Sequence, residues 1–144
     1  MKYLPVTIEF FIQLAKTQSR LTNRFDRALG GLSLTEFLVL LSLEQAPDRQ
    51  LRRIELAEQV GLTASGITRI LLPMAKIHLV KDGKVSDDAR VRTVEATKAG
   101  REKLNDERAR LNFLADELLP DGKKKDLITI TEFLKELGGR AMVR

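Results

Sequence analysis

The residues that could perform chemistry are few. The 144-residue chain contains no cysteine and one histidine, His78. Disulfides, thiolate metal sites and cysteine redox chemistry are therefore excluded, as is any site that needs two imidazoles. The carboxylates Asp87 and Asp88 are adjacent in a polar segment, which is an exposed place for acid–base work, and the sequence has no phosphate-binding loop. The sequence disfavours an enzyme and predicts neither a metal site nor a cofactor.

The excess positive charge of the chain is concentrated in one stretch. Residues 49–103 contain 12 Lys/Arg and 7 Asp/Glu, a net charge of +5, whereas the remaining residues contain 13 of each. A basic excess confined to one segment points to a polyanionic partner. A solvated charged surface would give the same composition, so the charge alone does not decide.

Within this stretch the pattern predicts two helices joined by a tight turn. In the first, over residues 53–60, we expect a buried face formed by Ile54, Leu56, Ala57 and Val60. Gly61 ends this helix, and Thr63 caps the next one. The second helix has aliphatic residues at helical spacing on the face opposite its small polar residues. These aliphatic residues are Ile67, Ile70, Leu71 and Met74.

The outward face of the second helix carries groups that suit the major groove of DNA. Arg69 can pair with guanine, and Ser65 and Thr68 can reach bases or phosphates. Thr63 and Gly66 complete the set, because small residues let the backbone approach base edges and a helix N-terminus favours phosphate. An ordinary helix cap in a protein that does not bind DNA would show the same Thr-Ala-Ser-Gly run.

A basic hairpin is predicted after this helix. Residues 79–81 and 91–96 have strand character, and residues 84–89 are polar and aperiodic, as in a loop. Asp88 can fix the direction of Arg90 so that the guanidinium enters the minor groove, although a plain surface ion pair would have the same spacing. The other basic residues predicted to contact DNA are Lys84 and Arg92 in the hairpin and Arg52, Arg53 and Lys76 at the phosphate backbone.

These residues together resemble the MarR family of bacterial winged-helix transcription regulators. The run ELAEQVGLTASGITRILLPMAKIHLV is followed by DDARVRTVEATKAG. Asp88-Ala89-Arg90 and Thr97-Lys98-Ala99-Gly100 fit the family's wing signature of Asp-x-Arg and Leu-Thr-x-x-Gly, with Ala96 in the Leu place. The matching motifs lie within residues 30–104, and the order of the predicted helices and strands resembles the family over the full length.

The sequence departs from the family pattern at three places. His78 replaces a glycine at a position that often needs positive φ. Pro73 falls inside the second helix, where we expect it to bend the helix or to loosen the hydrogen bond to the carbonyl of Arg69. Asp82-Gly83 replaces the basic start of the wing, and we expect it to bulge the strand.

Long apolar helices are predicted on both sides of the basic stretch, over residues 4–29, 33–45, 98–118 and 124–137. A capping box from Ser33 to Glu36 opens the second helix, and Thr97 caps the third. Gly30-Gly31 and Gly138-Gly139 are expected to end the first and the last. The terminal helices have more apolar surface than a winged helix of ~75 residues can cover. We therefore expect pairing with a second copy, although a deep core helix would also explain residues 4–29.

The predicted fold class is mainly α with a small β-hairpin wing, a winged helix-turn-helix domain flanked by N- and C-terminal dimerisation helices. We expect one MarR-like domain over residues 1–144, with residues 33–104 as the DNA-binding region and residues 1–32 and 105–144 as the helical dimerisation region. No apolar run approaches the ~18 residues of a membrane span, and no export signal is evident. A cytoplasmic location is therefore expected.

The predicted function is a homodimeric, sequence-specific DNA-binding transcription regulator that recognises a palindromic operator in double-stranded DNA. The family resemblance implies a repressor that is relieved by a small, often aromatic, effector bound between the dimerisation helices and the DNA-binding region. The alternative is a winged-helix protein-interaction module without sequence-specific DNA binding, in which the basic surface meets an acidic protein.

Overall fold

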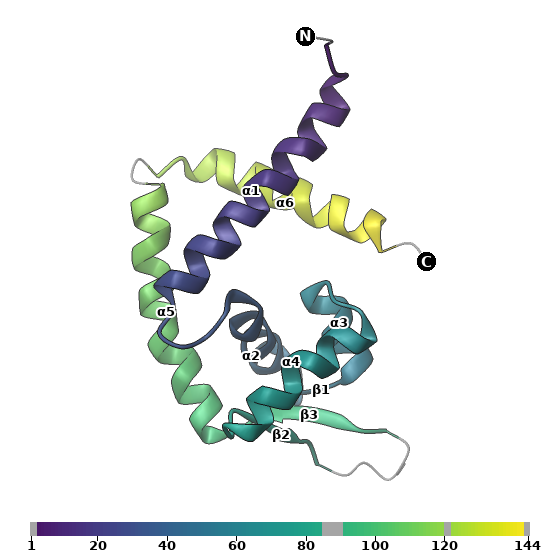
Figure 1. The fold of residues 1–144 in the computed structure, drawn as a ribbon, viewed down its shortest axis with the longest axis vertical. Helices are drawn as coiled ribbons and strands as arrows, with labels where there is room; N and C mark the ends of the chain where they lie inside the picture. The colour runs from purple at the N-terminus through teal and green to yellow at the C-terminus, as the bar shows by residue number, and fades with distance from the viewer. Residues whose placement is uncertain (1–2, 85–90, 120–121, 143–144) are drawn as a thin grey trace.

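The computed structural model describes residues 3–84, 91–119 and 122–142, which form six helices and one three-stranded sheet (Figure 1). The elements are α1 (Val6–Ala28), α2 (Leu34–Gln45), β1 (Gln50–Arg52), α3 (Arg53–Val60), α4 (Ala64–Lys76), β2 (Val80–Asp82), β3 (Thr93–Ala96), α5 (Lys98–Leu118) and α6 (Lys124–Ala141). The predicted fold class, mainly α with a small β wing, is confirmed. Among the described residues, no helix is both long enough and apolar enough to cross a membrane.

The helix starts follow the predicted caps, and one predicted helix end is wrong. Ser33 Oγ accepts from the Glu36 N–H at 3.1 Å, while the Ser33 N–H donates to Glu36 Oε1 at 2.8 Å. Thr97 Oγ1 accepts from the Gly100 N–H at 3.0 Å. In contrast, α6 continues through Gly138-Gly139 to Ala141. Neither of these glycines has a positive φ, and a glycine inside a helix costs only about 1 kcal/mol relative to alanine.

The sheet is antiparallel, with β3 between β1 and β2. The predicted bulge at Asp82-Gly83 is absent from the described residues, because Asp82 pairs with Val94 in unbroken register and the Gly83 N–H donates to the Thr93 carbonyl at 2.8 Å. A Cβ on Gly83 would lie 2.1 Å from Thr93 Oγ1, which donates to Gln50 Oε1 at 2.6 Å. Glycine therefore leaves room for a side-chain hydrogen bond between β1 and β3.

The core lies between α2, α3, α4, α5 and the sheet. Its fully buried side chains include Leu40, Leu43, Leu56, Ile67, Met74 and Leu104. The prediction that Ile54 is buried was wrong, since 51% of it is exposed. Leu56 and Ala57 are the buried residues of α3, and Ile54 lies about 110° around the helix from the centre of the face that they form.

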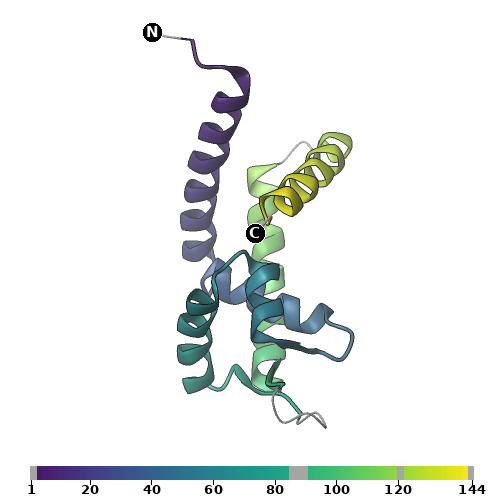
Figure 2. The same cartoon turned by 90° about the vertical axis from the view of Figure 1, so that its right-hand side faces the viewer.

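Helices α1 and α6 stand apart from this core. Helix α1 projects away from the winged helix, whereas the C-terminal end of α6 lies beside α3 (Figures 1 and 2), where Gly138 and Ala141 line a pocket with Ala57 and Gly61. Neither α1 nor α6 contains a buried residue in the single chain. They touch through the rings of Phe10 and Phe133, which meet edge to face with centroids 5.6 Å apart. Two long helices with exposed apolar faces thus flank a compact winged helix.

A buried carboxylate joins α5 to the turn between α1 and α2. Glu107 is fully buried, and its Oε2 accepts from the Gly30 N–H at 2.8 Å. Its Oε1 faces the ammonium group of Lys103 at 3.1 Å and the guanidinium group of Arg110 at 3.9 Å, without hydrogen-bond geometry. Lys103 also donates to the Gly30 carbonyl. Side chains of α5 therefore satisfy both backbone polar groups of Gly30.

The charge of Glu107 is maintained against its burial. Burial alone would raise the pKa of this carboxyl, but the Gly30 N–H, Lys103 and Arg110 together outweigh that effect and hold the pKa below the ordinary value of 4.5. Because the pKa is lower in the folded than in the unfolded chain, ionised Glu107 stabilises the fold above pH 4.5. That contribution is lost as the pH falls through the folded-state pKa.

We predict that Glu107→Gln lowers the free energy of unfolding by about 1–3 kcal/mol at pH 7, because it removes the charge that faces Lys103 and Arg110. The difference from the wild-type chain should shrink as the pH falls below 4.5. Urea unfolding at pH 3.5, 5 and 7 measures it. Glu102→Gln is the control, since Glu102 is exposed on the same helix and pairs with Lys98 only at 4.0 Å. Equal effects of both variants at every pH would contradict the conclusion that ionised Glu107 stabilises the fold.

We predict that Gly100→Ala destabilises the chain by about 1–3 kcal/mol through overpacking. Gly100 lies in the first turn of α5, and an added Cβ would be 2.1 Å from the Leu79 carbonyl oxygen, which belongs to the rigid backbone before β2. Gly139→Ala in α6, where an added Cβ meets nothing within 4 Å, should be neutral or slightly stabilising. Thermal unfolding of both variants tests this. A Gly100→Ala chain as stable as Gly139→Ala would show that the contact between α5 and Leu79 is not tight.

Candidate nucleic-acid interface

A tight turn sets the orientation of α4 relative to α3. Gly61 ends α3 with φ +73°, a left-handed conformation that favours glycine. The Leu62 N–H returns to the Ala57 carbonyl at 2.8 Å, and Thr63 Oγ1 accepts from the Gly66 N–H at 3.0 Å. The turn is thus closed from both sides, and α4 begins at a fixed point beside α3.

The two faces of α4 differ as the sequence predicts. Ile67, Leu71 and Met74 are buried, and Ile70 is half-buried against the same core. The opposite face is exposed to solvent over its whole length. Its exposed residues include Ser65, Thr68, Arg69, Leu72, Pro73 and Lys76. The sequence pattern alone did not single out Leu72, although it lies three residues beyond Arg69 on this face.

Hydrogen bonds within α4 determine what its hydroxyl groups can still do. Thr68 Oγ1 donates to the Ala64 carbonyl at 3.1 Å, so its lone pairs remain available as acceptors. Ser65 Oγ and Thr63 Oγ1 share a hydrogen bond of 3.2 Å. Gly66 is half-buried, and a Cβ there would lie 3.1 Å from Thr63 Oγ1. Gly66 thus faces the turn and supplies a capping N–H, while Ser65 and Thr68 face outward.

The basic side chains near α4 differ in how freely they can meet an anion. Arg53, Arg69 and Lys76 are exposed, and none makes an ion pair within 4.0 Å to another residue of the described ranges. In contrast, Arg52 pairs with Glu55 at 2.9 Å. The Arg52 backbone N–H and guanidinium hold the pKa of Glu55 below its ordinary value. Arg52 would therefore have to exchange this partner for a phosphate.

The predicted wing residues are only partly within the described ranges. Lys84 and Arg92 are both exposed, one on each side of residues 85–90. Asp88 and Arg90 lie outside the described residues, so their predicted minor-groove role stays a prediction. Lys81, at the start of the wing, pairs with Glu95 on the neighbouring strand at 3.3 Å.

The unusual residues at the end of α4 are accommodated within the fold. The expectation of positive φ at position 78 is confirmed, because His78 has φ +60°. Its carbonyl accepts from Thr97 Oγ1 at 2.5 Å, which ties the end of α4 to the start of α5. Pro73 does not end α4, which runs on to Lys76. The Ile77 N–H still reaches the Pro73 carbonyl at 3.2 Å.

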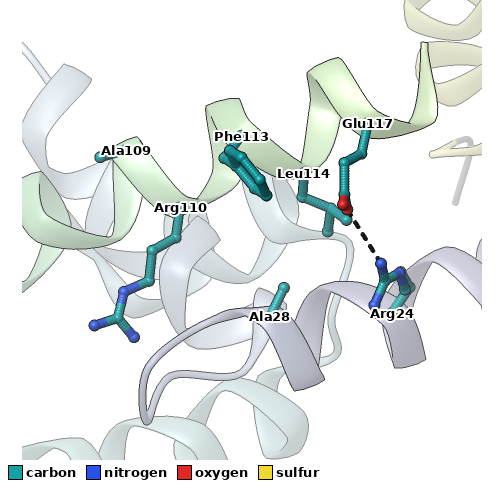
Figure 3. A pocket seen from close by; sticks show the side chains of 7 residues that line it. All are labelled: Arg24, Ala28, Ala109, Arg110, Phe113, Leu114 and Glu117. Carbon is teal, nitrogen blue, oxygen red and sulfur yellow. Dashed lines mark hydrogen bonds and ion pairs between the residues drawn. The ribbon is translucent and has the colours of Figure 1, made fainter. Parts of the chain in front are cut away.

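A cavity of about 460 Å³ lies between α1 and α5 (Figure 3). The ion pair between Arg24 and Glu117, at 3.2 Å, crosses its edge, and Phe113 supplies an aromatic wall that is 69% exposed. Its lining residues are Arg24, Ala28, Ala109, Arg110, Phe113, Leu114 and Glu117. This site has no signature in the sequence, because its two arginines are far apart in the chain and no local motif connects them.

The described residues hold no cluster of three or more His, Asp or Glu side chains that could bind a metal ion. The two surfaces with distinctive chemistry are the exposed face of α4 and the cavity between α1 and α5. The first presents a helix N-terminus, hydroxyl groups and exposed cations, which is the chemistry that recognises a polyanion.

Comparison with known proteins places this architecture among transcriptional regulators of known structure. BldR from Sulfolobus solfataricus superposes with a TM-score of 0.84 at 24% identity, covering 97% of this chain and 99% of that one. Sco3205, a MarR family regulator from Streptomyces coelicolor solved in complex with DNA, gives 0.81 at 18% identity, covering 99% and 92%. PcaV from the same organism, solved with its natural ligand, gives 0.82 at 15% identity, covering 98% and 99%.

No protein-family model and no curated protein sequence matches the chain. At these low identities the structural agreement establishes the fold. Because the agreement extends over nearly the full length of each chain, it includes the flanking helices as well as the winged helix. The chain therefore shares the fold of these transcriptional regulators, including that of the MarR family member Sco3205, from α1 through α6.

Proposed function

We propose that this protein is a MarR-family transcription regulator that binds double-stranded DNA sequence-specifically through α4. The observation that carries the proposal is the exposed face of α4, where Ser65, Thr68 and Arg69 stand outward over a buried aliphatic face. Small residues at the start of α4 allow its backbone to approach base edges. The structure of Sco3205 in complex with DNA supports DNA binding by a protein of this fold.

The proposed roles of the residues follow the two regions of the fold. Residues 33–104 form the DNA-binding region, with Arg69 reading guanine and with Arg53 and Lys76 on phosphates. Thr63 and Gly66 set the start of α4 against the backbone of the DNA, and Lys84, Asp88, Arg90 and Arg92 act from the wing. Arg52 also contacts a phosphate, once its ion pair with Glu55 is broken.

The flanking regions, residues 1–32 and 105–144, are proposed to form a homodimer. The large apolar side chains of α1 and α6 have no cover in the single chain: Val6, Ile128 and Ile130 are 82%, 65% and 52% exposed. Exposed apolar side chains in such number mark an interface. A two-fold dimer would place two copies of α4 about 34 Å apart, one turn of DNA, so the operator would be palindromic.

The proposed effector site is the cavity between α1 and α5. All its lining residues belong to the proposed dimerisation region, so this site differs from the expected one between the dimerisation helices and the DNA-binding region. Arg24 and Arg110 can neutralise a carboxylate or phenolate, and Phe113 offers a ring face, so a small aromatic anion fits the lining. The structure of PcaV with its natural ligand supports ligand binding by a protein of this fold. Binding here would change the angle between the dimerisation helices and α4, and so release a repressor from its operator.

We predict that the protein selects a palindromic sequence from a random duplex library and binds it as two 16.2 kDa chains per duplex. Arg69→Ala should relax the preference at one guanine per half-site by about 1–3 kcal/mol. Lys76→Ala should weaken binding to all duplexes alike and lower the salt slope by about two, because one phosphate contact is lost in each half-site. Fluorescence anisotropy at two salt concentrations and sedimentation of the complex measure these effects.

Lys135→Ala is the control, because Lys135 lies on α6 and pairs with Glu132 at 3.1 Å. This substitution should change neither affinity nor salt slope. The alternative function, a protein-interaction module, makes the opposite prediction. If the chain binds random duplex no better than polyglutamate and selects no sequence, the DNA-binding proposal is wrong and the alternative is favoured.

We predict that benzoate raises the thermal midpoint of the protein and weakens its binding to the selected duplex, whereas the uncharged benzamide does neither. A ligand at 100 times its Kd stabilises a protein by about 2.7 kcal/mol. Arg24→Ala should abolish the response, since it removes a cavity cation, while Arg20→Ala, one turn earlier on α1 and outside the cavity lining, should retain it. A response to benzoate that is unchanged in Arg24→Ala would place the effector elsewhere.

A further inference from the structure

Leu72 is an apolar side chain on the face of α4 that is otherwise polar and basic. It is 58% exposed, and it is flanked along the helix by Arg69 and Lys76, both exposed. At about 100° per residue, Leu72 lies about 60° from Arg69 and about 20° from Ser65 around the helix axis. It therefore belongs to the outward face and takes no part in the core that Leu71 and Met74 enter.

The position of Leu72 along the helix matches the spacing of base pairs. Three residues of α-helix rise ~4.5 Å, and successive base pairs of DNA are ~3.4 Å apart. If Arg69 contacts one base pair, Leu72 stands beside the next one. The side chains of Thr68 and Arg69 reach hydrogen-bonding groups, whereas Leu72 can offer only methyl groups.

The major groove contains one apolar feature, the 5-methyl group of thymine. At any other base edge, Leu72 would cover an amino or carbonyl group without giving it a hydrogen bond, and an unpaired buried polar group is costly. Leu72 would thus favour thymine over the other bases in two ways. Burial of the thymine methyl group is favourable, and desolvation of the polar groups on the competing bases is unfavourable.

We propose that Leu72 is a specificity-determining residue that reads the 5-methyl group of a thymine in the base pair adjacent to the one contacted by Arg69. The inference rests on the proposed function, sequence-specific DNA binding through α4. It adds a defined element to the operator, a thymine next to the guanine that Arg69 reads, in each half-site.

The test removes one methyl group at a time from the DNA. After selection of a consensus duplex by the full chain, each thymine is replaced by deoxyuridine, which lacks only the 5-methyl group, and the Kd is measured by fluorescence anisotropy. We expect one position per half-site at which the replacement weakens binding about fourfold, the factor that corresponds to burial of one methyl group (about 0.8 kcal/mol). Replacement in both half-sites should weaken binding about sixteenfold.

The matching protein variant is Leu72→Ala, which should bind the thymine and deoxyuridine duplexes equally. Ile77→Ala is the control, because Ile77 is also 58% exposed but lies at the end of α4, about 140° around the helix from Leu72. It should keep the full sensitivity to the methyl group. Since both side chains are exposed, both variants should unfold at the wild-type temperature.

The outcomes separate this inference from the proposed function. A selected consensus in which no thymine is sensitive, or in which Leu72→Ala remains as sensitive as the wild-type chain, overturns the role of Leu72 and leaves DNA binding intact. Failure to select any consensus overturns sequence-specific binding itself, and the role of Leu72 with it.

Discussion

The contact between Glu107 and Gly30 fixes the geometry on which the rest of the molecule depends. A buried carboxylate is tolerated only when its charge is compensated, and here the Gly30 N–H, Lys103 and Arg110 provide that compensation. Because Lys103 also holds the Gly30 carbonyl, the turn between α1 and α2 is attached to α5 at both of its polar groups. The winged helix and the projecting helices therefore share one rigid joint.

The same joint lies next to the cavity between α1 and α5, since Arg110 belongs to both. It faces Glu107 at 3.9 Å and also lines the cavity. In the proposed regulator, an anion bound in the cavity would compete with Glu107 for this guanidinium and so act on the joint directly. Arg24, which pairs with Glu117 in the free chain, would exchange one carboxylate for another. In this proposal, effector binding and the orientation of α4 would be connected through a few charged groups.

The features that the sequence predicts well are those that local interactions determine. Each of these involves residues within a few positions of one another: the capping box at Ser33, the left-handed turn at Gly61, the caps at Thr63 and Thr97, and the positive φ at His78.

The features that the sequence does not predict depend on contacts between residues far apart in the chain. Glu107 meets a glycine 77 residues away, and the cavity unites arginines from α1 and α5. Helix α6 continues through two glycines, so a glycine pair does not by itself end a helix. Ile54 is exposed, so an apolar residue type does not by itself ensure burial. The DNA-contacting roles of the α4 residues cannot be read from the fold alone, since exposure permits a contact without specifying one.

The exposed face of α4 combines three kinds of chemical group in fixed positions. Arg69 and Lys76 donate hydrogen bonds, Thr68 retains acceptor lone pairs because its proton is given to the Ala64 carbonyl, and Leu72 offers only methyl groups. These correspond to the three kinds of feature that base pairs present in the major groove: acceptors on guanine, amino donors on adenine and cytosine, and the methyl group of thymine. Because α4 is held by its cap at Thr63 and by the tie from His78 to Thr97, these groups keep their spacing before any DNA is bound. A rigid helix of this kind loses little conformational entropy on binding. The difference in interaction free energy between base pairs would therefore be retained almost fully in the affinity.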